Sequence, residues 1–314
     1  MPPRKPHMDN RKSVTGLFCA VSAYLIWGFS PIFFKAMASV PAFEILMHRM
    51  VWSFLFLLLM VILFKRRRRL TEALTSRHNL KLLSLSTLLV SGNWFLFIWA
   101  INSNHILQTS LGYYINPLVN VLLGTVFLKE RLRKLQMMAV VLAGSGVGYL
   151  TVHHGEFPWI ALTLAVSFGL YGFIRKTAPV EALEGLTVET LILSIPAALY
   201  LLYLHHTGAG SLFHDGFHMD LLLMGTALVT AFPLLLFTIG ARRLRFVTMG
   251  FLQYIAPSCT FVLAVFVYQE PFGRAQVYTF IMIWLALTLF SIDAVRAWHH
   301  SSGFKSSSSQ AVIK

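Results

Sequence analysis

The sequence predicts an all-α membrane protein of ten transmembrane helices, arranged as two inverted five-helix repeats. Three observations lead to this fold class: an excess of apolar residues, a one-sided distribution of basic residues, and an internal repeat. Of the 314 residues, 56% are hydrophobic and only 12% are charged, whereas a soluble domain carries about 25% charged residues. The composition therefore excludes a soluble enzyme, a disordered chain and a disulfide scaffold.

Ten apolar stretches are long enough, or nearly so, to cross a bilayer, which requires about 20 helical residues. The sixth stretch is the weakest because it is short and rich in small residues. Aromatic residues such as Tyr149, Trp159 and Tyr268 lie near span ends, as is typical of membrane interfaces. The expected spans are residues 14–34, 43–64, 80–101, 109–128, 136–152, 157–174, 186–204, 221–240, 247–268 and 276–295.

The basic residues predict how these spans are oriented. If the N-terminus is cytoplasmic, 23 of the 26 Lys and Arg residues fall in cytoplasmic loops or tails, 2 fall outside, and Arg49 alone lies within a span. Because basic loops resist translocation, this asymmetry supports two cytoplasmic termini. The net charge of +14 then reflects topology and attraction to anionic lipid, and we expect no nucleic-acid partner. The basic run 65–69 resembles a nuclear localisation signal, but it lies between two spans.

The chain contains one five-span unit twice. Shifted by 140 residues, Pro117 aligns with Pro257 and Glu130 with Glu270. Because five is odd, the second unit crosses the membrane in the opposite sense, a recurrent design in secondary transporters. A plain duplication that forms a stable helix bundle is the alternative. The expected segments are a basic tail 1–13, a first unit 14–152, a second unit 157–298 and a tail 299–314.

The first apolar stretch is expected to be a span. It is longer than the core of a signal peptide, which is about 7–15 residues. Retaining it also keeps the first unit of the repeat complete.

Ionisable residues inside spans are costly and are therefore functional candidates. Glu44, His48 and Arg49 share or adjoin one helical face near the outer end of the second span. Glu189 occupies the position equivalent to Arg49 in the second unit. We expect His48, Arg49 and Glu189 to serve gating or coupling, with Arg49 and Glu189 as an ion pair or a site for coupled protons. Alternatively, both charges lie near a span end and snorkel to water.

Amide, phenol and indole groups inside spans need partners on another helix or in a wet cavity. Such groups suit an organic solute better than a bare ion. Pro117 and Pro257 interrupt the helix at equivalent places and are expected hinges, unless they are static kinks. The residues expected to line a substrate cavity are Trp27, Asn93, Trp94, Tyr113, Tyr114, Asn116, Tyr171, Gln253 and Tyr254.

The remaining motifs indicate neither a cofactor nor a metal site. Histidines at 153–154 and 205–218 are ligand types, but solvated loop histidines are the simpler interpretation. No phosphate-binding loop, catalytic triad or Cys-x-x-Cys motif occurs. Cys19 and Cys259 lie in spans and are expected to pack as small apolar residues. Three glycines within 144–148 allow close helix approach, inside the bundle or in a homodimer.

Several longer strings and the spacing of Pro and Glu are similar to a known family. Each unit has a proline followed thirteen residues later by a glutamate, and the strings are 24–28 (YLIWG), 44–49 (EILMHR), 92–100 (GNWFLFIWA), 110–120 (SLGYYINPLVN) and 251–257 (FLQYIAP). From about residue 16 to residue 293, the chain resembles two EamA units of the drug/metabolite transporter superfamily, in particular its RarD subgroup. The resemblance implies a bacterial inner-membrane permease whose central cavity is lined mainly by spans 1, 3, 4, 6, 8 and 9.

We therefore expect a secondary transporter of a small organic metabolite or drug-like solute that works by alternating access. The resemblance implies export. The expected partners are that solute and membrane lipid, with no cofactor and no enzymatic activity. A membrane-embedded enzyme or a lipid scramblase is the alternative, although the only acid–base cluster for an enzyme is Glu44, His48 and Arg49.

Overall fold

A computed structural model describes residues 10–128, 133–154, 157–243 and 252–310. The described residues form helices and no strands. Their bounds are α1 (Asn10–Lys35), α2 (Ala42–Leu63), α3 (Arg67–Thr75), α4 (Arg77–Asn102), α5 (Ile106–Leu128), α6 (Lys134–His154), α7 (Trp159–Thr177), α8 (Ala182–Thr207), α9 (Phe217–Arg243), α11 (Ile255–Val262), the π-helical segment η1 (Leu263–Val267) and α12 (Arg274–Gln310).

Eight of the described helices are long and apolar enough to cross a membrane. Two further apolar helical stretches, Trp159–Arg175 and Ile255–Val267, are shorter. The chain is therefore a multi-pass membrane protein. The second of these stretches combines α11 with η1, and a π-helical segment in a membrane helix is frequently found at functional sites.

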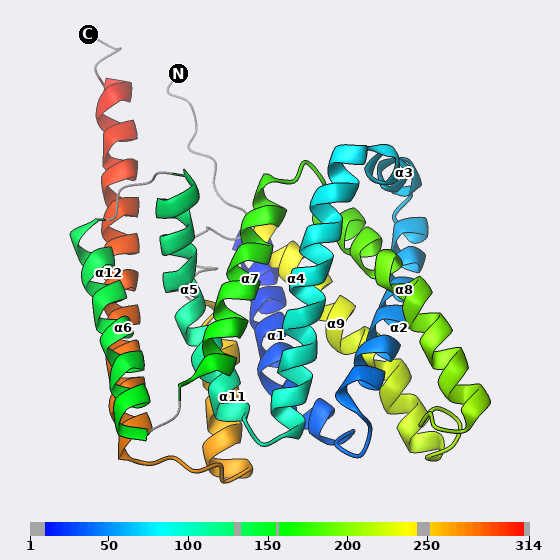
Figure 1. The fold of residues 1–314 in the computed structure, drawn as a ribbon. Coiled ribbons are helices and arrows are strands. Elements are labelled where there is room, and N and C mark those ends of the chain that lie inside the picture. Colours follow the sequence, from blue (N-terminus) through cyan, green and yellow to red (C-terminus); the bar gives the residue numbers. More distant parts are fainter. Residues whose placement is uncertain (1–9, 129–132, 155–156, 244–251, 311–314) are drawn as a thin grey trace.

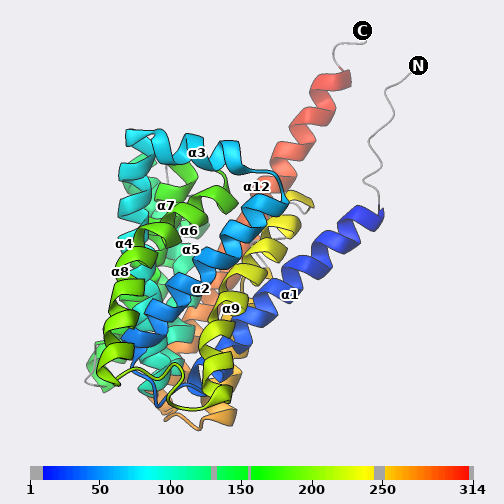
Figure 2. The same ribbon diagram turned by 90° about the vertical axis from the view of Figure 1, so that its right-hand side faces the viewer.

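The long helices form a bundle with two distinct ends (Figure 1). Helix α3 lies across one end, where α1 also begins and α12 ends; we call this the α3 end (Figures 1 and 2). The connections that follow α1, α4, α8 and η1 lie at the opposite end. Helices α6 and α12 pack together on one side of the bundle, while α2, α8 and α9 pack on the other. Between them lie α1, α4, α5, α7 and α11, which hold most of the candidate residues.

The segment after α2 contains a helix that the charge pattern did not predict. Residues 65–79 were expected to form a basic loop, yet α3 occupies Arg67–Thr75. Its Ala73 is buried against Leu83 of α4 and Val188 of α8. Small and apolar residues recur at helical spacing among the arginines, so the helix packs one side on the bundle and leaves most of the charges exposed.

One glycine of the group at 144–148 allows a close helix contact. A Cβ atom on Gly146 would lie 3.1 Å from the Cβ of Met282 on α12. Thr279 of α12 also donates a 3.1 Å hydrogen bond to the carbonyl of Gly146. The close approach therefore lies within the bundle at this position, between α6 and α12.

Candidate functional site

Arg49 is a buried cation on α2. It is the eighth residue of that helix and is 7% exposed. Its guanidinium carbon lies 4.0 Å from the centroid of the Trp94 ring and 5.6 Å from that of Phe34. A desolvated cation–π contact contributes about 2 kcal/mol, whereas an arginine at the centre of a membrane helix costs at least about 2.5–3.5 kcal/mol. One such contact alone therefore does not compensate the charge, and neither ring supplies a hydrogen-bond acceptor for the guanidinium.

Arg49 has no anionic partner among the residues that the structure describes. Among the described residues, no carboxylate oxygen lies within 4.0 Å of its guanidinium, and its Nε atom is buried without a hydrogen-bond partner. The ion pair expected between Arg49 and Glu189 is thus not formed in this structure. Helices α2 and α8 begin at opposite ends of the bundle, and each of these residues lies only about 10 Å from the start of its own helix. The two charges are therefore offset along the bundle axis.

His48 and Glu44 continue the polar face of α2 toward its first turn. Nε1 of Trp52 donates a 3.3 Å hydrogen bond to Nδ1 of His48, so a neutral imidazole carries its hydrogen on Nε2. That Nε2 lies 3.9 Å from a Glu44 oxygen and makes no hydrogen bond. Glu44 instead accepts a 2.7 Å bond from the backbone nitrogen of Ser211. The carboxylate of Glu44 is therefore used to fix the connection between α8 and α9.

Glu189 is a buried anion with three donors around it. It is the eighth residue of α8 and is 2% exposed. Its two oxygens accept hydrogen bonds from Ser86 of α4 at 2.6 Å and from Tyr171 of α7 at 3.2 Å. Nε of Arg175, also on α7, lies 3.6 Å from the first of these oxygens. A Cβ atom on Gly185 would overlap the guanidinium of Arg175, so this glycine leaves the space that the guanidinium occupies.

A row of aromatic rings joins the surroundings of the two buried charges. At one end of the row, the ring centroid of Tyr113 lies 5.8 Å from that of Phe97, which in turn lies 6.0 Å from that of Phe34 beside Arg49. The ring centroids of Tyr113 and Phe168 are 6.0 Å apart, and those of Phe168 and Tyr171 are 5.9 Å apart. Tyr171 then donates its hydroxyl hydrogen to Glu189. The row therefore connects the surroundings of Arg49 on α2 with Glu189 on α8, whose carboxylate accepts hydrogen bonds. The rings between them belong to α5 and α7.

Two expected cavity residues hold helices together. Asn93 of α4 donates hydrogen bonds to the carbonyl of Leu164 at 3.0 Å and to Oγ of Ser167 at 2.9 Å. Asn116 of α5 donates a 3.1 Å hydrogen bond to the carbonyl of Ala165. Both amides are buried, so they fix α4 and α5 against α7 and thereby position the aromatic row.

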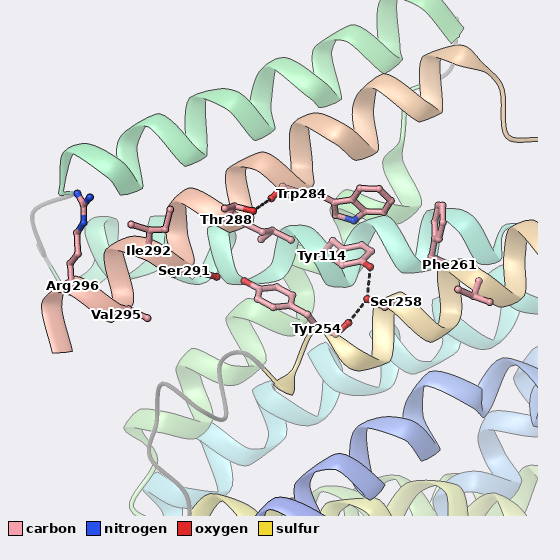
Figure 3. Close-up of a pocket in the computed structure, with 12 residues that line it drawn as sticks. Tyr114, Tyr254, Ser258, Phe261, Trp284, Thr288, Ser291, Ile292, Val295 and Arg296 are labelled. Atoms are coloured by element: carbon pink, nitrogen blue, oxygen red, sulfur yellow. Dashed lines mark hydrogen bonds between the residues drawn. The ribbon is translucent and has the colours of Figure 1, made fainter. Parts of the chain in front are cut away.

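Two further expected residues lie elsewhere, at a hollow of about 920 Å³ between α5, α11 and α12 (Figure 3). Tyr114 donates or accepts a 2.7 Å hydrogen bond with Oγ of Ser258, and its ring stacks on that of Tyr254 at 6.4 Å. Trp284 and Arg296 of α12 also line this hollow, which is largely apolar. Neither buried charge described above lies there, although Ser258, Ser291 and Arg296 place polar groups on its wall.

The last two cavity candidates lie on either side of the contact between α1 and the second unit. Trp27 of α1 is half-buried, and its ring centroid lies 5.9 Å from that of Phe237 on α9. Gln253 is half-buried in the turn that precedes α11. Among the described residues, no ring contact or hydrogen bond joins Trp27 or Gln253 to the Tyr113–Phe168–Tyr171 row.

The two expected hinge prolines both lie inside helices. Pro117 is within α5 and Pro257 is within α11. Oγ of Ser110 donates a 2.8 Å hydrogen bond to the carbonyl of Pro257, which ties α5 to α11 at the proline. Glu130, expected at the end of the fourth span, lies outside the described residues.

Comparison with known proteins identifies the family. The model of the EamA-like transporter family matches residues 14–152. The chain is 48% identical to a protein of Vibrio cholerae named "Uncharacterized transporter", over 93% of this chain and 96% of that protein. It is 42% identical to Protein RarD of Escherichia coli, over 94% of this chain and all of that protein. This chain belongs to the EamA-like transporter family.

More distant comparisons agree with this membership. The chain is 30% identical to a "Chloramphenicol-sensitive protein RarD" of Pseudomonas aeruginosa, over 91% of this chain and 96% of that protein. One solved crystal structure superposes with a TM-score of 0.58 at 18% identity, covering 88% of this chain and 97% of the other. The latter likeness establishes a shared fold and nothing about activity.

Three residues at the buried charges of this EamA-family chain were not predicted from the sequence. Arg175 was assigned to the loop between the sixth and seventh spans, but it lies in α7 and its side chain is 13% exposed. Ser86 and Phe34 are common residue types in a membrane helix and carry no pattern that marks them. For Arg175 a sign was available, because it is a basic residue near the end of the first helix of its unit, as Lys35 is in the other unit.

Proposed function

We propose that this chain is a secondary transporter that exports a small organic solute across the bacterial inner membrane by alternating access. In this proposal ten helices cross the membrane as two inverted repeats, and both termini, together with the α3 end, are cytoplasmic. The eight long helices and two shorter apolar stretches support the count, with α3 as an additional helix at the surface. The bias of 23 basic residues to one side supports the orientation.

The observation that carries this proposal is the pair of buried charges at equivalent places in the two units. Arg49 and Glu189 are each the eighth residue of a helix, on α2 and α8 respectively. Helices α2 and α8 begin at opposite ends of the bundle, so one charge lies nearer each end. The aromatic row between them is a line of ring contacts that ends at Glu189. A static bundle has no need for a buried charge near each end.

The proposed roles of the other residues follow from their places. The rings of Trp94, Tyr113 and Tyr171 contact the solute along the row, while Asn93 and Asn116 hold the helices that carry these rings. Pro117 and Pro257 act as hinges where α5 meets α11. His48, beside Arg49 and with a free Nε2, together with Glu189, serves gating or ion coupling. Trp27, Tyr114, Gln253 and Tyr254 lie off the row and are proposed to contact solute only when the helices rearrange.

Counterflow in proteoliposomes tests the proposal. Purified protein is reconstituted, the vesicles are loaded with single unlabelled solutes, and uptake of the labelled solute is followed. The panel contains neutral phenicols, amino acids, organic cations and organic anions. We expect saturable counterflow of at least one solute, and its loss in Glu189→Ala. The control variant Glu72→Ala removes a glutamate whose side chain is 61% exposed on α3, and it is expected to retain counterflow.

The same vesicles distinguish the other classes of function. Flipping of a fluorescent lipid without counterflow of any solute indicates a scramblase and contradicts the proposal. Chemical conversion of a solute, detected by mass spectrometry of the vesicle contents, indicates an enzyme and also contradicts it.

A further inference from the structure

We propose that Arg49 binds the oxyanion of the transported solute, so that the substrates are small organic anions carrying a carboxylate or a phosphate. This inference rests on the transporter function proposed above and narrows its substrate class. The evidence for it is the environment of the Arg49 guanidinium, namely the aromatic rings that contact it and the carboxylates on the surrounding helices.

Arg49 is held in place without being neutralised. The ring of Trp94 at 4.0 Å and the ring of Phe34 at 5.6 Å contact the guanidinium through their π systems. Contacts of this kind use the face of the guanidinium and leave its five N–H donors free. No hydrogen bond joins these donors to another described residue, and Nε is buried with none. Arg49 thus supplies a largely buried guanidinium whose donors have no acceptor among the described residues.

The carboxylates on the helices around Arg49 already accept hydrogen bonds from other groups or pair with other arginines. On α2 itself, Glu44 accepts from the Ser211 backbone. On α8, Glu184 lies 3.2 Å from Arg66, and Glu189 accepts from Ser86 and lies near Arg175. On α9, Asp220 accepts a 2.6 Å bond from the backbone nitrogen of Phe213. The remaining groups near Arg49 are the neutral hydroxyl of Tyr113 and His48, so no described residue supplies the missing anion.

The free fork matches the geometry of an oxyanion. An arginine binds a carboxylate or a phosphate through two parallel N–H···O bonds, which a lysine does not reproduce. The Tyr113–Phe168–Tyr171 row continues from Phe97 and from Phe34, which contacts Arg49, and can contact the apolar body of the same molecule. At the other end of the row, Glu189 already has its donors and does not compete for Arg49. The expected ligand is therefore an amphipathic organic anion, bound at its charged end.

Titration of the detergent-purified full chain tests this assignment. The chain contains seven tryptophans, so the signal of Trp94, which contacts Arg49, is the difference in intrinsic fluorescence between the unaltered chain and Trp94→Phe. The probes are benzoate, benzyl phosphate and the neutral analogue benzamide. We expect saturable quenching by benzoate or by benzyl phosphate, and binding of benzamide weaker by roughly tenfold or more, because it cannot form the charged bidentate contact. Comparable binding of all three probes, or no saturable quenching by either anion, would overturn the assignment.

Variants separate recognition from folding. In Arg49→Gln we expect the affinity for the anion to fall roughly tenfold or more, and in Arg49→Lys to fall by a smaller factor because charge is kept but the fork is lost. The control Arg68→Gln alters an arginine whose side chain is 92% exposed, and it is expected to bind like the unaltered chain. Unchanged affinity in Arg49→Gln would contradict the proposal. If Arg49→Gln does not fold, the comparison of benzoate with benzamide on the unaltered chain decides.

Two further measurements separate the remaining possibilities. The first shows whether the bound anion is a soluble solute or a lipid headgroup, and the second shows whether the substrate class or the transporter function is wrong. A short-chain phosphatidylglycerol that binds at Arg49 while both soluble anions fail would mean a lipid headgroup, and would contradict a soluble substrate. In the counterflow panel, exchange of neutral or cationic solutes alone, with Arg49→Gln fully active, would overturn the substrate class while leaving the transporter function intact. Absence of counterflow for every solute would instead contradict the transporter function.

Discussion

Glu189 and Arg175 stabilise each other only while both are present. The carboxylate is 1% exposed and the guanidinium 13% exposed, with 3.6 Å between them. Removing one partner of a buried pair leaves an uncompensated charge, and such a change costs roughly 3 kcal/mol or more. We therefore expect Glu189→Ala and Arg175→Ala each to lower the unfolding temperature in detergent markedly. The double variant is expected to be more stable than the sum of the two single effects predicts.

The exposed pair of Arg68 and Glu72 is the matched control for this cycle. Its two groups are 3.0 Å apart, closer than the buried pair, but they are 92% and 61% exposed. Solvent screens such a pair, so we expect Arg68→Ala and Glu72→Ala to leave the unfolding temperature nearly unchanged. Additive effects at both pairs would show that Glu189 and Arg175 are not coupled.

At the scale of single residues, the sequence identified the unusual positions but not their partners. Arg49 and Glu189 are conspicuous because a charge in an apolar span is costly. Their partners depend on the rotation of each helix about its own axis and on its position along the bundle axis. A membrane helix is apolar on its lipid-facing side as well as on its packed side, so the apolar pattern does not define that rotation. Phe34, Ser86 and Arg175 were therefore found only in the structure.

At the scale of helices, the contact between α1 and α11 depends on Gly28. A Cβ atom at this position would lie 2.7 Å from the Cβ of Cys259 and 3.1 Å from the carbonyl oxygen of Ala256. Neither group can move aside without moving α11. Thr260 also donates a 3.3 Å hydrogen bond to the Gly28 carbonyl, which a separation of the helices would break. We expect Gly28→Ala to destabilise the protein by about 1–3 kcal/mol, measured as a lower unfolding temperature.

Gly144→Ala is the matched control, because no atom lies within 4 Å of the added Cβ. Both glycines are inside helices, where alanine is favoured over glycine by up to about 1 kcal/mol. We therefore expect the two substitutions to change stability in opposite directions. If both substitutions changed the unfolding temperature equally, the neighbours of Gly28 would have room for an added Cβ atom.

The start of α5 is held by an acid from the other unit. Both oxygens of Glu270 accept backbone hydrogen bonds, from Ile106 at 2.7 Å and from Leu107 at 2.8 Å. The first amides of a helix have no partner within the helix, and a negative charge at this end is favourable. We expect Glu270→Gln, which keeps only one acceptor oxygen, to lower stability by about 1–2 kcal/mol in the same thermal measurement. The exposed Glu72→Gln is the control and is expected to have no effect.

The positions of most helices could be predicted from the sequence, because bilayer thickness fixes the length of an apolar span. The span expected at 43–64 is α2, Ala42–Leu63, and the span expected at 80–101 lies within α4, Arg77–Asn102. The exception is α3. A short amphipathic helix at a membrane surface needs no long apolar stretch, so the hydropathy that marks spans does not mark it. The position of α3 is fixed by tertiary contacts of Ala73, and counting charges along the sequence does not reveal these contacts.

At the scale of the whole molecule, two equivalent glutamates hold the two ends of the bundle. Glu44 and Glu184 are each the third residue of their helices, α2 and α8, which pack against each other. Glu44 accepts from the Ser211 backbone at the opposite end, and Glu184 contacts Arg66 at the α3 end. Each unit therefore holds a connection that belongs to the other unit. In an alternating-access cycle these contacts form and break in turn, whereas in a static bundle they are independent.

This difference gives a prediction for the whole molecule. Reporter cysteines are placed at Ser110, buried at the contact of α5 with α11, and at Ala73, on the buried side of α3, after Cys19 and Cys259 are replaced by alanine. Loss of a net hydrogen bond worth about 1 kcal/mol shifts a two-state equilibrium about fivefold.

Glu184→Gln should therefore make the cysteine at position 73 about fivefold more reactive toward a maleimide and the cysteine at position 110 less reactive. Glu44→Gln should do the reverse. The control Glu72→Gln, on the exposed side of α3, should change neither rate. The decisive measurement is the reaction rate of the cysteine at the end distant from the substituted glutamate. Local loosening of one end explains only a faster reaction at that end. A slower reaction at the other end requires that the two ends share one equilibrium, which is the property that alternating access needs and a rigid bundle lacks.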